Sequence, residues 1–219
     1  VVPLDMRVEL DSYAHFKHAR SAWAGLEFPE PWGRVKLPEE RAVQALDDKS
    51  GASLKLSVLN PAGRIWTMVA GGGASVVYAD TVVNLGMGHE LANYAEYSGN
   101  PKQEETYLYA KTLLSLATRV LDGRRRVLLI GGGVANFTDV AATFTGIIQA
   151  LKDCAGKLQG AKLHLYVRRG GPNYEAGLRM MQQLGEEISV PVTVFGPDAS
   201  MTSIVQLAIQ YLESDPAAS

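Results

Sequence analysis

Three glycine-rich turns carry the residues of this sequence that are best suited to holding an anion. They are GGGAS at 71–75, GGGVANFT at 131–138 and RRGGPN at 168–173. Each turn directly follows a short apolar segment that is typical of a β-strand. The first backbone N–H groups of a helix have no partner within the helix, and glycine lets a ligand approach the backbone closely. Such turns therefore favour a carboxylate or a phosphate.

The middle turn is the most informative of the three. Asn136 and Thr138 are mediocre helix formers, and we expect them in the first turn of a helix that follows the glycines. Their side chains could donate hydrogen bonds to a carboxylate. The spacing leaves a second interpretation open, in which Asn136 or Thr138 only caps the helix.

The third turn adds positive charge. Arg168 and Arg169 are neighbours at the end of a predicted strand, so their side chains should point to opposite faces of the sheet. One arginine could then reach a ligand cleft, while the other meets solvent or an acidic partner. A guanidinium group can bind a carboxylate or a phosphate through two parallel hydrogen bonds. The alternative is a pair of surface arginines with no ligand.

Motifs for nucleotides and metals are missing from these turns. Asn136 stands where a Gly-x-Gly-x-x-Gly fingerprint needs its third glycine, and no Gly-x-x-x-x-Gly-Lys-Ser/Thr motif occurs. His15 and His18 have helical spacing, but no nearby cysteine or carboxylate completes a metal set. His89 lies in a glycine-rich loop and is a weaker functional candidate. We expect His164 to be packed within a strand.

Composition narrows the class of protein. The chain has 219 residues, of which 47% are hydrophobic, and its formal net charge is -2. This fits a globular domain with a substantial core, and it argues against a nucleic-acid partner. We interpret the basic run at 124–126 as a solvated turn. No segment approaches the ~18 apolar residues that a membrane span needs.

The single cysteine and the first residues bear on where the protein works. Cys154 cannot form an internal disulfide, which favours a reducing, cytoplasmic location and a structural role for the thiol. The sequence begins VVPLD, with neither an initiator methionine nor a signal-peptide pattern. We therefore expect a processed or partial form of a longer protein.

The elements that would position the three turns alternate along the chain. Expected strands lie at 54–59, 65–69, 91–97, 127–130, 163–167 and 190–195. Expected helices lie at 75–85, 103–118, 134–151, 178–188 and 200–211. This alternation predicts right-handed βαβ units and a parallel sheet, which binds ligands at the carboxyl ends of its strands. The first two strands, joined by NPAG at 60–63, suggest a hairpin or a tight corner.

The N-terminal part differs from the remainder. Residues 1–46 are rich in proline, tryptophan and charge, and we expect an irregular connector that ends in a short helix at 39–47. We assign residues 47–219 to one α/β domain.

Several long segments resemble ATP-citrate lyase. They are WTMVAGGGASVVY at 66–78, LANYAEYSG at 91–99, residues 130–144 and VRRGGPNY at 167–174. The resemblance covers nearly the whole chain. Residues 4–7 and 196–197 are more similar to the short chain of the two-chain plant and algal enzyme than to the fused animal chain. The same turns resemble, more distantly, the β subunit of succinyl-CoA synthetase.

The resemblance implies a Rossmann- or flavodoxin-like parallel α/β fold of the succinyl-CoA synthetase type. It also implies a citrate-binding role within an enzyme that converts citrate, ATP and coenzyme A to acetyl-CoA, oxaloacetate, ADP and phosphate. In that family an ATP-grasp domain phosphorylates a histidine, the phosphoryl group passes to citrate, and coenzyme A attacks citryl phosphate.

Site residues follow from the matching motifs. The implied citrate ligands are Gly133, Val134, Ala135, Asn136, Phe137, Thr138 and Arg169. Phe137 would form a wall of the site, and Arg169 would pair with a carboxylate. As a weaker expectation, a phosphoryl group would lie near Gly72, Gly73, Ala74 and Ser75. No residue of the chain is expected to act as the catalytic nucleophile.

Much of the implied enzyme has no counterpart in this sequence. Residues 1–46 match only the last strand of the ATP-grasp domain, where Asp5 resembles a magnesium ligand that lacks its companions. None of the four histidines has the glycine-rich setting of the phosphorylated one. The coenzyme A site is missing too, as is the citryl-CoA-cleaving partner subunit. We therefore expect ATP, magnesium and coenzyme A in the full enzyme only, and an inactive chain in isolation.

Two other functions remain open. The same surfaces could serve mainly to dock a partner subunit, as a non-catalytic assembly module. The fold would also suit a succinyl-CoA-synthetase-type acyl-CoA ligase, although the sequences at 136–138 and 168–171 favour citrate.

Overall fold

The computed structural model describes residues 2, 4–5, 12–26 and 35–215. The chain divides into two compact units, Val1–Val35 and Lys36–Ser219. In the first unit, α1 (Ser12–His18) is followed by a turn in which the rings of His18 and Trp23 lie 5.0 Å apart. The second unit carries the sheet, and the candidate ligand turns all belong to it.

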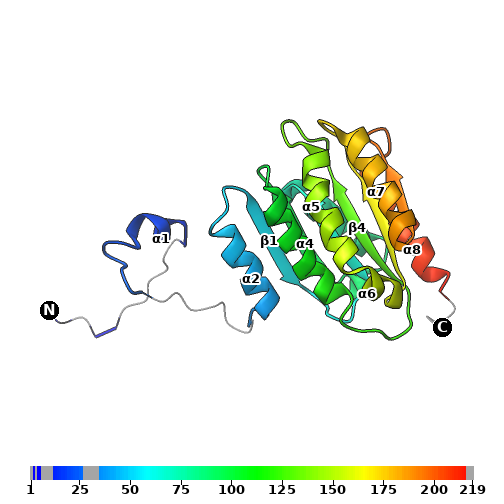
Figure 1. Cartoon of the computed structure of the whole chain (residues 1–219). Coiled ribbons are helices and arrows are strands. Elements are labelled where there is room, and N and C mark those ends of the chain that lie inside the picture. The colour runs from blue at the N-terminus through cyan, green and yellow to red at the C-terminus, as the bar shows by residue number, and fades with distance from the viewer. Residues whose placement is uncertain (1, 3, 6–11, 27–34, 216–219) are drawn as a thin grey trace. The chain divides into compact units, whose positions relative to one another are not determined.

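The second unit is a six-stranded sheet with helices on both faces (Figure 1). The strands are β1 (Ser53–Val58), β2 (Ile65–Ala70), β3 (Asn93–Ser98), β4 (Arg126–Gly132), β5 (Leu163–Arg168) and β6 (Val192–Phe195). The helices are α2 (Pro38–Asp47), α3 (Gly72–Asn84), the 3₁₀ turn η1 (Gly88–Glu90), α4 (Gln103–Ala117), α5 (Val140–Asp153), α6 (Ala155–Gly160), α7 (Tyr174–Ile188) and α8 (Ser203–Glu213).

The strand order is β1-β3-β2-β4-β5-β6. All neighbouring pairs are parallel except β1 and β3, which are antiparallel. This confirms the predicted α/β class and the mainly parallel sheet. Because β2, β3, β4 and β5 run in the same direction, the turns that follow them meet at one edge of the sheet.

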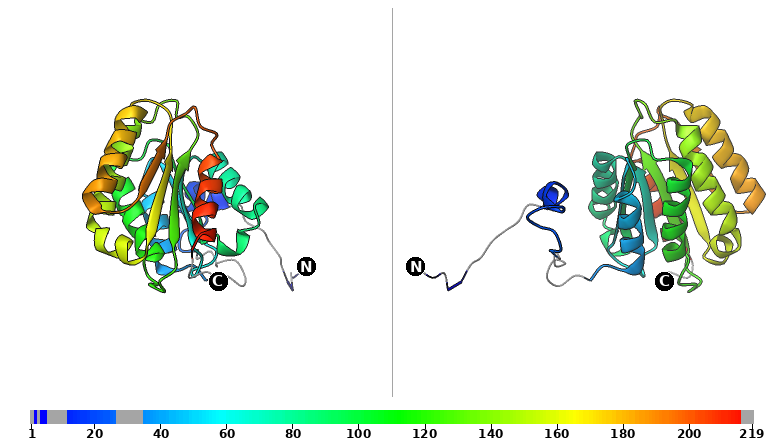
Figure 2. Two further views of the ribbon diagram at one scale, coloured as in Figure 1. Left: turned by 90° about the vertical axis from the view of Figure 1, so that its right-hand side faces the viewer. Right: turned by 60° about the vertical axis from the view of Figure 1, so that its left-hand side comes forward.

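Two hydrophobic clusters explain why the sheet is covered on both faces. The larger cluster lies under α2, α4, α5 and α7, and the smaller one lies under α3 and α8. Figure 2 shows the sheet between these two layers of helices. Every residue of β4 is buried, as a central parallel strand requires, and this accounts for its apolar sequence.

Of the two alternatives for the connection between β1 and β2, the structure has the tight corner and not the hairpin. β1 pairs only with β3, and β2 lies between β3 and β4, so the two strands are not neighbours. The turn at 60–63 is present, with Gly63 N donating to Asn60 O. A Cβ at Gly63 would approach Glu90 O to 2.6 Å, so the turn packs against η1 rather than closing a hairpin.

The short helix expected at 39–47 is present as α2, and its contacts place it in the sheet-bearing unit. Val43 is buried, and the Glu40 carboxylate accepts a hydrogen bond of 2.8 Å from Val58 N at the end of β1. The compact unit therefore begins at Lys36, before the expected boundary at residue 47.

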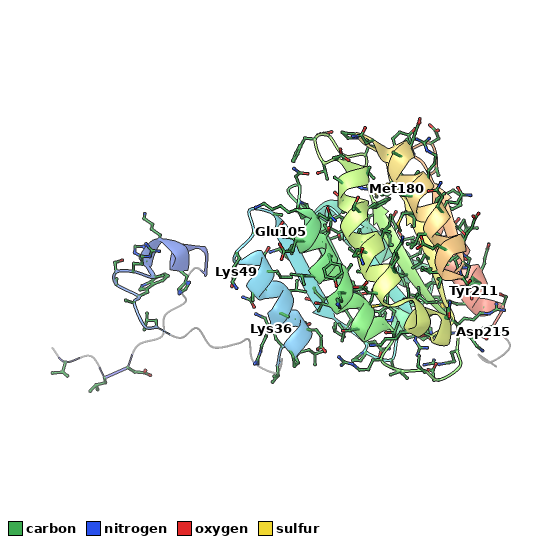
Figure 3. All side chains as sticks on the ribbon, viewed as in Figure 1. Lys36, Lys49, Glu105, Met180, Tyr211 and Asp215 are labelled. Atoms are coloured by element: carbon green, nitrogen blue, oxygen red, sulfur yellow. The ribbon has the colours of Figure 1, made fainter. Side chains whose placement is uncertain are left out.

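The basic run at 124–126 is not simply a solvated turn. The Arg126 side chain is buried and pairs with Asp122 at 2.9 Å, at the start of β4. Arg125 N donates to Asp215 Oδ2 at 2.7 Å, and its guanidinium donates to Tyr211 O. Figure 3 labels Tyr211 and Asp215 at the C-terminal end of α8. Arg125 thus attaches the last helix to the amino edge of the sheet, and Arg126 fixes the loop that leads into β4.

Two sequence expectations in the core are confirmed. His164 is partly buried, stacks on Tyr166 at 4.1 Å and lies 2.9 Å from Thr193 Oγ1. Cys154 is a buried free thiol at the C-terminal end of α5. Among the described residues, no helix has both the length and the apolar character needed to cross a membrane.

Candidate functional site

A pocket of about 320 Å³ opens at the carboxyl edge of the sheet. Loop 133–138 after β4 forms one side of it, and Gly71 and Ala74 at the start of α3 form another. Residues 97–99 at the end of β3 and Arg169 after β5 complete most of the lining. The structure therefore brings together the first two glycine-rich turns and one arginine of the third.

Loop 133–138 is not part of a helix, which corrects the prediction. Val134 forms a parallel bridge with Gly170, and Ala135 N donates to Gly170 O, so this segment continues alongside the end of β5. Helix α5 begins only at Val140. A ligand in the pocket would therefore lie on a loop, and not on the N-terminus of α5.

The cap of α5 is Asp139, which neither competing interpretation named. Its carboxylate accepts hydrogen bonds from Ala142 N at 2.9 Å and from Asn173 Nδ2 at 2.7 Å, and these bonds hold the pKa of Asp139 below its usual value. Val140 N donates to Pro172 O. These N–H groups are thus occupied within the protein.

The capping interpretation of Asn136 and Thr138 is therefore wrong, and both side chains remain available. Both line the pocket, and neither makes a hydrogen bond within the described part of the chain. Thr138 is buried, whereas Asn136 is exposed. Phe137 also lines the pocket, and 72% of its surface is exposed. The loop thus offers two polar side chains next to an exposed aromatic ring.

The two arginines have separate roles. Arg169 lines the pocket although only 5% of its surface is exposed, and its Nη1 donates to Gly133 O at 2.7 Å. Arg168 points to the opposite face, as alternation predicts, but it does not meet solvent. Its guanidinium donates to the carbonyl oxygens of Gly132, Pro197 and Ala199. Arg168 therefore joins the β4 and β6 ends, and Arg169 supplies the charge of the pocket.

Gly132 leaves room for the guanidinium group of Arg169. A Cβ at Gly132 would lie 2.7 Å from Arg169 Nη1 and 3.0 Å from the Ala70 side chain. Any larger residue at Gly132 would displace the guanidinium group. The glycine at this position thus has a steric reason that the sequence could not reveal.

The first turn of α3 is the helix N-terminus that faces the pocket. Gly71 precedes α3 with a φ of 95°, which favours glycine, and Gly71 and Ala74 line the pocket. Ser75, by contrast, is buried, and its hydroxyl donates to Gly71 O at 2.9 Å. Of the predicted 72–75 group, Ala74 lines the pocket, and Gly72, Gly73 and Ser75 do not.

Sequence reasoning missed the contribution of β3. Tyr97, Ser98, Gly99 and Pro101 all line the pocket. The sequence pattern around Tyr97 indicates only a residue of the core or of an interface. β3 was a recognisable strand, but its position beside β2 could not be read from the chain order.

Metal ligands do not gather in the described residues, where no group of three or more histidine, cysteine or acidic side chains could hold an ion. Asp5 lies in the Val1–Val35 unit. His89 does not line the pocket.

Fold and site together define a mainly parallel α/β domain with an arginine-lined pocket at the carboxyl edge of its sheet. Residues 34–211 match the sequence model of a family described as "ATP citrate lyase citrate-binding". The chain therefore belongs to the ATP citrate lyase citrate-binding family.

Individual relatives agree with this assignment. The chain is 59% identical over 210 residues to ATP-citrate synthase alpha chain protein 1 of Arabidopsis thaliana, covering 96% of this chain and 49% of the plant protein. It is 53% identical over 209 residues to human ATP-citrate synthase, covering 95% of this chain and 19% of the human protein. The chain thus spans about half the length of its plant relatives.

A solved structure has the same fold. The ATP citrate lyase from Methanothrix soehngenii, in complex with citrate and coenzyme A, is 55% identical with a TM-score of 0.91. The match covers 95% of this chain and 55% of the archaeal chain.

Proposed function

We propose that this chain binds citrate in the pocket formed by loop 133–138 and Arg169. The observation that carries the proposal is the buried Arg169 guanidinium, which lines the same pocket as two polar side chains without hydrogen bonds in the described part of the chain, Asn136 and Thr138. Citrate is close to a trianion at neutral pH and needs a cation together with several donors. A guanidinium group in a poorly solvated pocket meets the first need, because charge attraction is stronger away from water.

The N-terminus of α3 provides a second source of positive charge at the pocket. Gly71 and Ala74 at the first turn of this helix line the pocket, and a helix N-terminus carries about half a positive charge. We propose that this turn, with Gly72 and Gly73, faces a second anionic group, such as a phosphoryl group passing to citrate. Ser75 is not part of that role, because its hydroxyl is occupied within α3.

In the complete enzyme, the chain would act as the citrate-binding part of an ATP-citrate lyase. The names of the relatives and the citrate and coenzyme A in the archaeal complex support this. ATP, magnesium and coenzyme A would then be bound with the help of an ATP-grasp domain and a citryl-CoA-cleaving partner subunit. Residues 1–35 would connect to the ATP-grasp domain, with Asp5 as one magnesium ligand. The buried free thiol fits a cytoplasmic enzyme.

A docking role is the second candidate, and exposed apolar side chains favour it. Val134 and Phe137 on the pocket loop are 61% and 72% exposed, which suits contact with a partner subunit. Docking and citrate binding can coexist. They differ in whether Arg169 is needed for the ligand or only for the partner.

Isothermal titration of the 219-residue chain with citrate and with succinate tests the proposal. We expect citrate to bind and succinate to bind at least about tenfold more weakly, because succinate lacks one carboxylate and one hydroxyl that the pocket can hydrogen-bond. Equal affinities would favour the acyl-CoA ligase alternative. No binding of citrate by the folded chain would contradict a citrate site formed by this chain.

A further inference from the structure

Tyr97 has a buried hydroxyl group that the fold leaves without a partner. The side chain is 1% exposed, and its hydroxyl makes no hydrogen bond within the described part of the chain. Nearby Tyr109, whose ring lies 6.3 Å away, donates its hydroxyl to Lys55 O. An unpaired hydroxyl is costly in a core, and phenylalanine would fill the same space without that cost.

The hydroxyl belongs to a residue at the edge of the pocket. Tyr97 lines the pocket together with Arg169. Both side chains lie on the same face of the sheet, because Tyr97 packs in the larger core cluster with Val167, two residues before Arg169. Tyr97 is therefore positioned to act on the same ligand as Arg169.

Register across the sheet explains how two distant strands can share one ligand. Tyr97 on β3 pairs with Ala70 on β2, and Ala70 pairs with Gly132 on β4. The Arg169 guanidinium lies over Gly132. The row therefore has a large polar side chain at each end and two small residues between them. Because the guanidinium reaches back over Gly132, the position between it and the Tyr97 phenol is that of Ala70, whose small side chain also lines the pocket.

The phenol is in its neutral form at physiological pH. Burial raises the pKa of Tyr97, and the charge of Arg169 only partly opposes this effect. A neutral phenol keeps its proton and can donate it in a hydrogen bond. Tyr97 lines a pocket whose positive charge comes from Arg169, and an anion held there would supply an oxygen that accepts this hydrogen bond.

We propose that the Tyr97 hydroxyl donates a hydrogen bond to a carboxylate oxygen of the bound tricarboxylate, on the side of the ligand opposite Arg169. Tyr97 is thus a ligand-orienting residue that fixes which carboxylate faces β3. This assignment rests on the proposed citrate site. It explains why an otherwise unfavourable hydroxyl lies in the core.

The matched test compares Tyr97→Phe with Tyr78→Phe by calorimetric titration and thermal unfolding of the whole chain. Tyr78 is also fully buried with a hydroxyl that lacks a hydrogen-bond partner in the described part of the chain, but it lies on α3 in the other core cluster and does not line the pocket. The titrants are citrate and propane-1,2,3-tricarboxylate, which has the same three carboxylates without the hydroxyl.

Tyr97→Phe is expected to lower the affinity for both titrants by about tenfold, the usual effect of losing a hydrogen bond to a charged group. The free Tyr97→Phe variant should unfold at the same temperature as the wild type or higher, and Tyr78→Phe should bind like the wild type. Weaker binding of citrate alone would overturn the carboxylate assignment, since Tyr97 would then bind the hydroxyl group of citrate instead.

Two further outcomes separate this inference from the proposed function. If the wild type binds citrate and Tyr97→Phe binds it with the same affinity, only the role of Tyr97 is overturned. Failure of the wild type to bind either titrant would overturn the citrate site and the role of Tyr97 together.

Discussion

Replacing Arg169 with alanine is expected to weaken citrate binding by about 100-fold or more. A doubly hydrogen-bonded guanidinium–carboxylate pair in a buried site contributes about 3 kcal/mol, which corresponds to this factor. Arg169 is the buried cation that lines the pocket, so the described residues of the pocket wall offer no substitute. Calorimetric titration gives the affinity, and circular dichroism and thermal unfolding report whether the fold is kept.

Two variants serve as controls for this result. Arg169→Lys keeps the charge but loses the planar pair of donors, so we expect an intermediate loss. Arg179→Ala removes an exposed arginine of α7 that does not line the pocket and should leave the affinity unchanged. Wild-type affinity in Arg169→Ala, together with weaker binding of a partner subunit, would instead support the docking function.

Gly146→Ala is expected to lower the free energy of unfolding by about 3 kcal/mol, at the upper end of typical overpacking effects. Gly146 lies where α5 packs closely on the first turn of α4. A Cβ there would overlap the Thr106 hydroxyl and the Gln103 carbonyl oxygen, and the latter is backbone that cannot rotate away. Urea unfolding at equilibrium measures the change.

Gly156→Ala is the matched control, because Gly156 is an exposed helical glycine with no atom near the added Cβ. Alanine is favoured over glycine in helices, so this variant should be neutral or up to about 1 kcal/mol more stable. Similar unfolding free energies for the two variants would show that the α4–α5 crossing is not as tight as the structure has it.

The sequence predicted the architecture well because periodicity and turn chemistry are local signals. The apolar run at 127–130 could only be a strand buried on both faces, and β4 is one. The rule that ligands bind at the carboxyl ends of parallel strands then located the site at 131–138 and 168–173. Pocket residues 133–138 and Arg169 agree with that expectation.

The predictions were wrong where contacts between segments far apart in the sequence decide the structure. The predicted helix at 134–151 begins too early because Val134 pairs with Gly170, a contact between the segments that follow β4 and β5, which no local pattern reveals. The β1–β2 hairpin was wrong for a related reason: β3 occupies the position beside β2. Arg168 was expected at the surface, but carbonyl oxygens from β4 and from residues 197–199 surround it.

The central claim, that this chain carries a citrate site on loop 133–138 and Arg169, is tested most directly by following the backbone amide signals during a citrate titration by NMR. We predict that the amides of residues 133–138 and 169 shift together, with one saturation curve, while those of residues 189–192 at the opposite edge of the sheet stay in place. Shifts concentrated away from the pocket, or none at saturating citrate, would contradict the claim.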